Sequence, residues 1–343
     1  MSGTRHHFIP RFLQRGFASR VVGDTVFTWV FRRDKPPFES NTINVGAEGH
    51  FYADQDSDAD PQVTSEEPRF ASLVDGLRGT RQTQPIGDAR QLAELITHLM
   101  KRTRAVRRGM KQVFGRLITA LVSHMEGPEL EQILVKYLTA NPAVLRGALV
   151  KCGVDEHLLS TAEPYILSHL PELAPILAAG LRPLLHRLRH EAPKLLETAS
   201  KSGHIQAIER ISTEMPPPEW LSSLSYEVRT LETPALVLGD STIVVVARRS
   251  DGSVGFRAMW ESPEVLLAVV LPLRPDSCLV GRVPSYELDL ESIPAACARS
   301  SSEFFIAGAN TAAARALHPL IATGEPLMAG LDIDAIVREA GWN

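Results

Sequence analysis

The chain has 343 residues, which is enough for one large domain or two ordinary ones. Apolar residues make up 44% and charged residues 22%, the composition of a soluble globular protein. The formal net charge is −4, so nucleic-acid binding would need a local basic patch rather than a basic whole.

Cysteine usage and hydropathy indicate the compartment. Cys152, Cys278 and Cys297 are far apart and form no CxxC pair, which argues against a zinc ribbon and suits a reducing cytoplasm. The first residues include arginine and histidine rather than an apolar run. No stretch reaches the about 18–20 uninterrupted apolar residues of a membrane span. We expect a cytoplasmic protein without a membrane segment.

The first distinctive pattern is the opening stretch, residues 4–17. Two adjacent histidines lead into an apolar segment, and the residues concerned are His6, His7, Phe8, Phe12, Leu13 and Phe17. A chain terminus is usually frayed and polar. This one carries enough apolar surface to be held in a core, so we predict that it is ordered and buried.

A small β region is expected over residues 1–87. Residues 25–31 are rich in β-branched and aromatic side chains and predict a strand, and paired prolines predict a turn at 32–37. A second extended segment is expected at 50–52. The acidic residues 54–60 lack the glycine and glutamate register of a calcium loop, which favours a solvated loop.

A helical region is expected over residues 88–214. From Asp88, a plausible N-cap, apolar residues keep the spacing of one long amphipathic helix that ends at Gly127. Further helices are predicted at 128–139, 142–152, 155–170, 171–199 and 204–209. Prolines are expected to break the later part of this region into short pieces.

The last region, residues 215–343, changes to a period of two. It predicts strands at 234–238, 242–249, 254–260, 265–271 and 278–283, and helices at 301–320 and 332–340. The predicted class is therefore α+β: a small N-terminal β-hairpin, a central helical bundle and a C-terminal, mostly antiparallel sheet with closing helices, in one compact unit.

Several of these segments resemble one bacterial family, the domain of unknown function 4238. Its members open with His-His-x-x-Pro-x-x-x-Leu-x-x-Phe, which residues 6–17 resemble, and later segments follow the family's order. The similar segments are Asn41–Val45, Phe51–Tyr52, Arg102–Arg107, Leu238–Ser241, Leu271–Pro275 and Asn310–Arg315. The resemblance extends over nearly the whole chain and implies positions of interest, although it implies no activity.

Candidate catalytic residues lie at both ends of the chain. Histidine has an ordinary pKa near 6.5, which suits acid–base catalysis and metal binding. His6 and His7 are therefore candidates, with a buried structural role as the alternative. Asp240 follows an apolar strand and Gly239, a position that suits a cleft but also a hairpin turn. We predict that a histidine of the pair and Asp240 share one site.

Five basic residues form a stripe beside the apolar face of the helix predicted from Asp88. These residues, here called the basic stripe, are Arg102, Arg104, Arg107, Arg108 and Lys111. The stripe would hold the phosphates of RNA or DNA, or else form salt bridges to the surplus acids. Asn41 and Asn310 are further polar candidates, and Asn310 is most simply a helix N-cap.

Two functions are compatible with these patterns. The first is a nuclease-like hydrolase that acts on a phosphodiester, with His6 or His7 and Asp240 as catalytic groups and a divalent metal as an open alternative. The second is a non-catalytic module that binds nucleic acid or protein and whose histidines are structural. P-loop, Rossmann, α/β-hydrolase and zincin motifs are absent from the sequence, which disfavours those enzyme classes.

Overall fold

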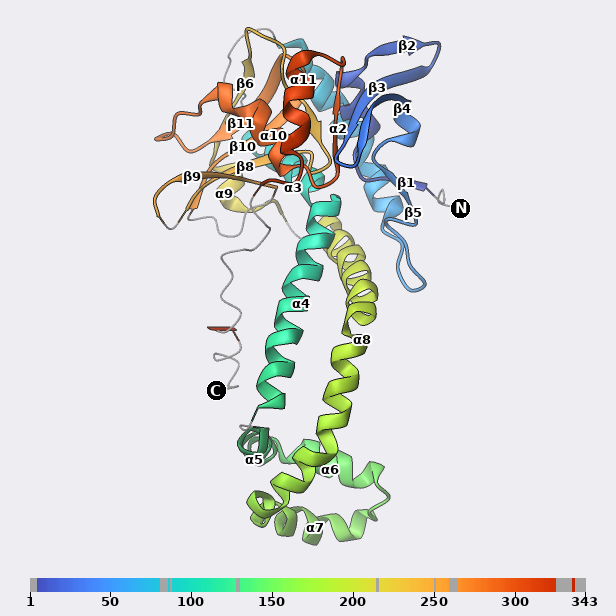
Figure 1. The fold of residues 1–343 in the computed structure, drawn as a ribbon, viewed down its shortest axis with the longest axis vertical. Helices are drawn as coiled ribbons and strands as arrows, with labels where there is room; N and C mark the ends of the chain where they lie inside the picture. The colour runs from blue at the N-terminus through green and yellow to red at the C-terminus, as the bar shows by residue number, and fades with distance from the viewer. Residues whose placement is uncertain are drawn as a thin grey trace. The chain divides into compact units, whose positions relative to one another are not determined.

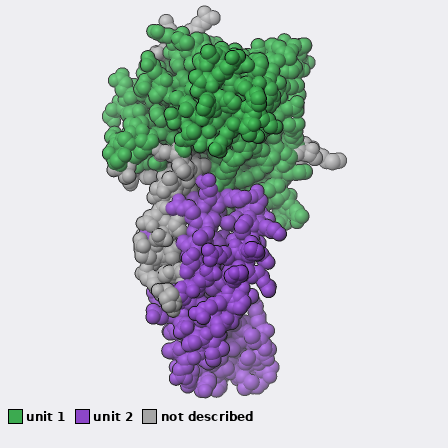
Figure 2. All heavy atoms as spheres, viewed as in Figure 1, with its two compact units in different colours: residues 1–110, 200–330 green, residues 111–199, 331–343 purple. Residues whose placement is uncertain are grey.

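The computed structural model describes residues 5–80, 86, 88–127, 130–213, 216–249, 251–258, 265–324 and 335–336. The fold is α+β, as predicted. Two compact units divide the chain: unit 1 comprises Met1–Met110 and Ser200–Gly330, and unit 2 comprises Lys111–Ala199 and Leu331–Asn343 (Figure 2). These units differ from the three predicted contiguous regions, because unit 1 combines segments from both halves of the sequence.

The opening stretch is part of the core of unit 1. Strand β1 (Arg5–His7) pairs antiparallel with β5 (Ala47–Gly49), and the short helices α1 (Arg11–Gln14) and η1 (Arg15–Phe17) follow β1 (Figure 1). The apolar side chains of this stretch are 0–5% exposed, and they are Phe8, Ile9, Phe12, Leu13 and Phe17. The predicted burial of the opening stretch is confirmed.

One sheet of unit 1 has the strand order β2-β3-β12-β7, with β4 paired to β3. Its strands are β2 (Arg20–Val22), β3 (Thr25–Arg32), β4 (Lys35–Asn41), β7 (Leu238–Gly239) and β12 (Phe304–Ala307). The strand predicted at 25–31 is confirmed as β3. Pro36 and Pro37, predicted in a turn, lie instead in the edge strand β4 at a shift of register, where the missing N–H groups are tolerated.

The C-terminal half of this sheet corrects two predictions. The segment predicted as a helix at 301–320 begins with β12, because Phe304–Ala307 pair with β3 and β7 and are buried. Helix α11 (Ala312–Leu317) and η5 (His318–Leu320) follow. The strand predicted at 234–238 is reduced to the two residues of β7. The helix predicted at 332–340 lies outside the described residues apart from 335–336.

The second sheet of unit 1 is fully antiparallel in the order β6-β11-β10-β8-β9. Its strands are β6 (Ser225–Thr230), β8 (Val244–Arg248), β9 (Val254–Arg257), β10 (Leu266–Arg274) and β11 (Ser277–Arg282). Four of these strands correspond to predicted ones, whereas β6 was not predicted. The short helices η4 (Leu290–Ser292) and α10 (Ile293–Ser300) follow β11.

Helices complete unit 1 and differ from the prediction in two places. Helix α2 (Asp60–Gly79) occupies a segment predicted as loop. The long helix predicted from Asp88 is two helices, α3 (Ala89–Lys101) and α4 (Arg104–Glu126), and the Asp88 N-cap is confirmed by a 2.9 Å bond from Gln91 N–H. Thr103 starts α4 by accepting a 3.4 Å hydrogen bond from Val106 N–H. After α8 the chain continues through α9 (Glu219–Ser222) and 3₁₀ helix η2 lies earlier, at Thr42–Asn44.

Unit 2 is helical over its described residues. Helices α5 (Leu130–Ala140), α6 (Pro142–Lys151) and α7 (Glu156–Ser168) precede α8 (Leu170–Thr213). Pro175, Pro183 and Pro193 lie inside α8, so the predicted division into short pieces is wrong. A proline removes one backbone hydrogen bond and bends a helix, but the flanking turns continue it here. No single helix in the described part of the chain has the length and apolar content of a membrane span.

Candidate functional site

The opening motif folds around a buried arginine, Arg102, at the break between α3 and α4. Its side chain is 1% exposed and all three of its nitrogens have partners. Nε donates to the Tyr52 hydroxyl (2.8 Å), and Nη2 donates to the His7 carbonyl (2.6 Å) and the Glu67 carboxylate (2.7 Å). Nη1 contacts His98 Nε2 at 2.9 Å. We call these five residues the Arg102 cluster; its hydrogen bonds join β1, α2 and α3.

The two histidines of the motif are part of this local structure. His6 Nδ1 accepts a hydrogen bond from the Tyr52 N–H (2.9 Å), and the two rings stack. The His7 carbonyl accepts from Arg102 and from the Tyr52 hydroxyl (2.9 Å). Burial, followed by the positive charge of Arg11, lowers the pKa of His7 to about 4. His7 is therefore a neutral imidazole at pH 7, and the hydrogen bonds of both histidines support a structural role.

Asp240 is bound to a turn of its own sheet. Its side chain is 1% exposed, and its two oxygens accept from the backbone N–H groups of Ser302 (2.6 Å) and Glu303 (2.8 Å). Burial raises the pKa of this carboxyl to about 6. Among the described residues, the hydrogen bonds of Asp240 thus differ from those of the histidines, and the shared His–Asp240 site is not formed by them.

The basic stripe forms ion pairs within the protein. Arg104 contacts Glu48 (2.7 Å) and Glu303 (2.6 Å), and Arg107 contacts Glu48 at 3.0 Å. Arg107 also donates to the carbonyl of Phe51. Two further pairs complete the set, Arg108–Glu303 and Lys111–Glu197, while Arg102 is buried. The salt-bridge alternative of the sequence analysis therefore describes the stripe, and the predicted phosphate-binding face is corrected.

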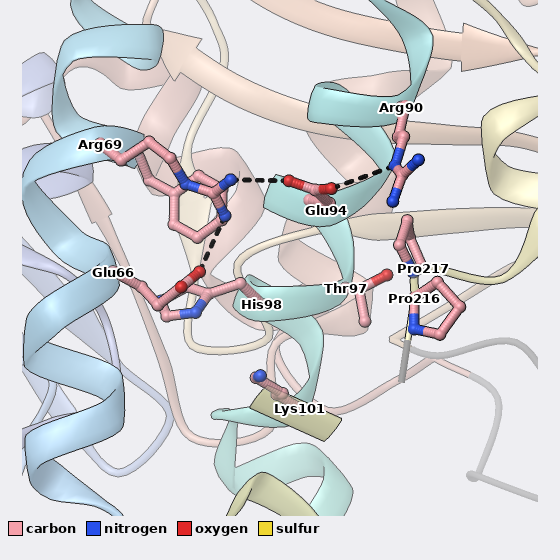
Figure 3. Close-up of a pocket in the computed structure, with 10 residues that line it drawn as sticks. Glu66, Arg69, Arg90, Glu94, Thr97, His98, Lys101, Pro216 and Pro217 are labelled. Atoms are coloured by element: carbon pink, nitrogen blue, oxygen red, sulfur yellow. Dashed lines mark hydrogen bonds and ion pairs between the residues drawn. The ribbon is translucent and has the colours of Figure 1, made fainter. Parts of the chain in front are cut away.

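A polar cavity of about 190 Å³ lies between α2 and α3 (Figure 3). We call it the α2–α3 cavity; its lining residues are Glu66, Arg69, Phe70, Arg90, Glu94, Thr97, His98, Lys101, Pro216 and Pro217. Arg69 donates to Glu66 and to Glu94, each at 2.8 Å. His98 belongs both to this lining and to the Arg102 cluster, so the opening motif supports one wall of the cavity.

Comparison with known proteins gives a family for the part of the chain that builds these features. The family model described as "Protein of unknown function (DUF4238)" matches residues 5–116. Residues 5–116 belong to the DUF4238 family. The whole Arg102 cluster and most of the cavity lie within this DUF4238 region. No curated protein and no solved structure matches the chain.

The predicted polar residues divide between the DUF4238 region and the rest of the chain. Asn41 lies within it, and its side chain accepts from Ile43 N–H (3.0 Å) at the start of η2, a structural cap. Asp240 and Asn310 lie outside the matched stretch. Asn310 accepts from Arg315 Nε (2.8 Å), whereas the N-cap of α11 is its neighbour Thr311. The predicted N-cap was therefore one residue early.

The α2–α3 cavity was missed by the sequence analysis because α2 was not predicted. Few apolar residues and two prolines, Pro61 and Pro68, concealed the helical period of this segment. Charge spacing was the available signal, since Glu66–Arg69 and Arg90–Glu94 are pairs at i, i+3 and i, i+4. Among the described residues, no group of three or more histidine, cysteine or carboxylate side chains is arranged to hold a metal ion.

His204, at the end of unit 1 nearest in sequence to α8, provides a pH-dependent prediction. It is fully buried; its Nε2–H donates to the Lys101 carbonyl (2.6 Å), and its Nδ1 accepts from Arg107. Burial, followed by the charge of Arg107, lowers its pKa to about 4. As the pH falls from 6.5 toward 4, the unfolded chain binds a proton that the folded chain does not, so stability is lost. We expect this histidine to contribute a loss of about 2–3 kcal/mol by pH 4.5.

Urea unfolding at pH 7 and pH 4.5 measures this effect. His204→Gln should remove the contribution and narrow the difference between the two pH values. His186→Gln, a change at an exposed histidine of α8, should leave the difference as in the unchanged protein. Equal pH dependence of the His204→Gln variant and the unchanged protein would contradict the prediction.

Proposed function

We propose that this protein is a non-catalytic protein-binding module whose motif histidines are structural. The hydrogen bonds of His6, His7 and Asp240 support this choice over the hydrolase, because they end on backbone groups and on neighbouring side chains. The ion pairs of the basic stripe disfavour RNA or DNA as the partner, since phosphates would have to displace carboxylates of the protein itself. Cys152, Cys278 and Cys297 are free thiols, which supports a cytoplasmic setting.

The observation that carries the proposal is a row of exposed leucines on α8. Leu177, Leu184, Leu188 and Leu195 are 39%, 55%, 37% and 52% exposed. With the half-buried Leu181, they follow the a/d spacing of a heptad repeat, the pattern of a helix that packs against another helix. A different stripe of α8, which includes Ala178 and Leu185, already packs against Leu130 inside unit 2. The row, here called the leucine seam, is thus a second apolar face.

Charge beside the leucine seam indicates the chemistry of its partner. Between residues 182 and 194, α8 carries four arginine or lysine residues and one glutamate. Arg187 and Lys194 occupy the g positions that flank the seam when Leu181, Leu188 and Leu195 are a positions. A partner helix with leucines on one face and acidic flanks therefore complements both the shape and the charge of α8. The same positive flanks would repel each other in a pair of identical helices.

We expect a designed peptide helix with leucine at a and d and glutamate at e and g to bind α8. Fluorescence anisotropy of the labelled peptide should show affinity at least tenfold weaker for the double variant Leu184→Glu, Leu188→Glu, because both changes bury a charge in the apolar contact. Ile176→Glu is the matched control, since Ile176 is 69% exposed on the same helix but off the seam. Its affinity should match that of the unchanged protein.

Two outcomes would contradict this function. Equal peptide affinity of the double variant and the control would show that the leucine seam does not dock a helix. A stable dimer in sedimentation that the double variant abolishes would show that a second copy occupies the seam. The hydrolase stays a prediction without a supporting contact.

A further inference from the structure

The lining of the α2–α3 cavity carries an excess of positive charge. Arg69, Arg90 and Lys101 face it against two carboxylates, Glu66 and Glu94, which makes a difference of one positive charge. Both carboxylates are held by Arg69, and Arg90 approaches Glu94 at 3.5 Å. The acids are therefore compensated by arginines, and the surplus charge lies toward Lys101. Such a cavity attracts a small anion with one negative charge.

Two buried polar atoms beside Lys101 have no hydrogen-bond partner within the described structure. They are Thr97 Oγ1 and His98 Nδ1, and both residues line the cavity. The protonation of His98 follows from its other nitrogen. A guanidinium can only donate, so Nε2 accepts from Arg102 Nη1, and Nδ1 carries the proton. Buried polar groups are normally paired, so an unpaired hydroxyl and an unpaired N–H in one cavity indicate a missing acceptor.

The positions of these groups on α3 bring them together. Thr97, His98 and Lys101 are separated by three and four residues, which places them on one face of the helix, as Figure 3 shows. Phe70 and the rings of Pro216 and Pro217 provide apolar walls. A cavity of about 190 Å³ has room for a small organic body as well as its charged group. These features fit a molecule with an anionic head and an apolar body.

We infer that the α2–α3 cavity binds a small organic monocarboxylate, with its carboxylate at Lys101, Thr97 and His98 and its carbon skeleton against Phe70 and the two prolines. A carboxylate matches the single surplus positive charge better than a phosphate dianion does. Its oxygens can accept hydrogen bonds from an ammonium, a hydroxyl and an imidazole N–H. This inference is independent of the leucine seam, because the residues involved belong to unit 1.

Calorimetric titration with benzoate tests the site. Lys101→Met keeps the apolar stem and removes the charge, and we expect at least tenfold weaker binding. Burial lowers the pKa of Lys101 to about 8, so its protonated fraction falls from about nine-tenths at pH 7 to about one-tenth at pH 9. The affinity of the unchanged protein should fall by about tenfold over that range. Arg33→Met, which removes an exposed positive charge outside the cavity, is the control and should bind as the unchanged protein does.

A second variant separates ligand binding from folding. Thr97→Val removes a buried hydroxyl without a partner, so it should not lower the melting temperature, but it should weaken benzoate binding several-fold. Benzoate that binds Lys101→Met as tightly as the unchanged protein would overturn the site. Inorganic phosphate that binds more tightly than benzoate would overturn the assignment to a carboxylate. Absence of benzoate binding up to 10 mM, taken as an order-of-magnitude limit for small ligands, would overturn both.

Discussion

A chain that begins at Ser19 is expected to lose its cooperative fold. The deletion removes five apolar side chains that are 0–5% exposed: Phe8, Ile9, Phe12, Leu13 and Phe17. Burying one such side chain contributes about 1.5–3 kcal/mol, so together they contribute about 8–15 kcal/mol. The net stability of a protein is about 5–15 kcal/mol, so no stable fold should be left. Near-ultraviolet circular dichroism and urea unfolding measure the loss.

A point variant makes the same prediction in a chain that still folds. Leu13→Ala, at a fully buried position, should lower the free energy of unfolding by about 2–5 kcal/mol. Val21→Ala, at a position that is 61% exposed, is the control and should change it by less than about 0.5 kcal/mol. If the shortened chain unfolds at the same urea concentration as the full chain, the opening stretch does not belong to the core.

Replacement of Arg102 by methionine should be the most destabilising single change in the DUF4238 region. The methionine fills part of the space but leaves the Glu67 carboxylate, the Tyr52 hydroxyl and the His7 carbonyl without their donor. Removing one partner of a buried charge pair costs about 3–5 kcal/mol, because the other charge stays buried and unpaired. Urea unfolding at pH 7 measures the difference.

Two comparisons show whether the guanidinium geometry is the cause. Arg102→Lys keeps the charge but lacks the planar set of five donors, so it should recover only part of the lost stability. Arg90→Met on the neighbouring helix removes a side chain that is 73% exposed and should change stability by less than about 0.5 kcal/mol. Full recovery with lysine, or an equal loss at Arg90, would show that the Arg102 cluster does not hold the motif together.

Local patterns predicted those elements whose side chains are distinctive along the chain. The β-branched and aromatic run at 25–31 became β3, and the alternating segments after residue 240 became β8 to β11. The apolar opening stretch became part of the core. In each case the burial that stabilises the element is encoded by neighbours in the sequence, so a period of two or a cluster of large apolar residues was sufficient.

Elements that depend on distant contacts were predicted poorly. Residues Phe304–Ala307 lie in a segment that looked helical, yet they pair with β3, a strand more than 270 residues earlier in the chain. The break between α3 and α4 occurs where Arg102 is drawn into the core by Tyr52 and Glu67. Prolines that seemed to end helices are tolerated inside α8. Tertiary packing outweighed local propensity at each of these places.

The same division holds for the candidate sites. The sequence by itself determined the residue types: two histidines before an apolar segment, five basic residues on one helix face, and a leucine heptad on α8. Only the tertiary structure decided that Glu48 and Glu303 pair with the basic face, and that α2 and α3 enclose a polar cavity. The physical reason is that charge pairing and burial depend on distance in space, and residues 48 and 303 come from opposite ends of the chain.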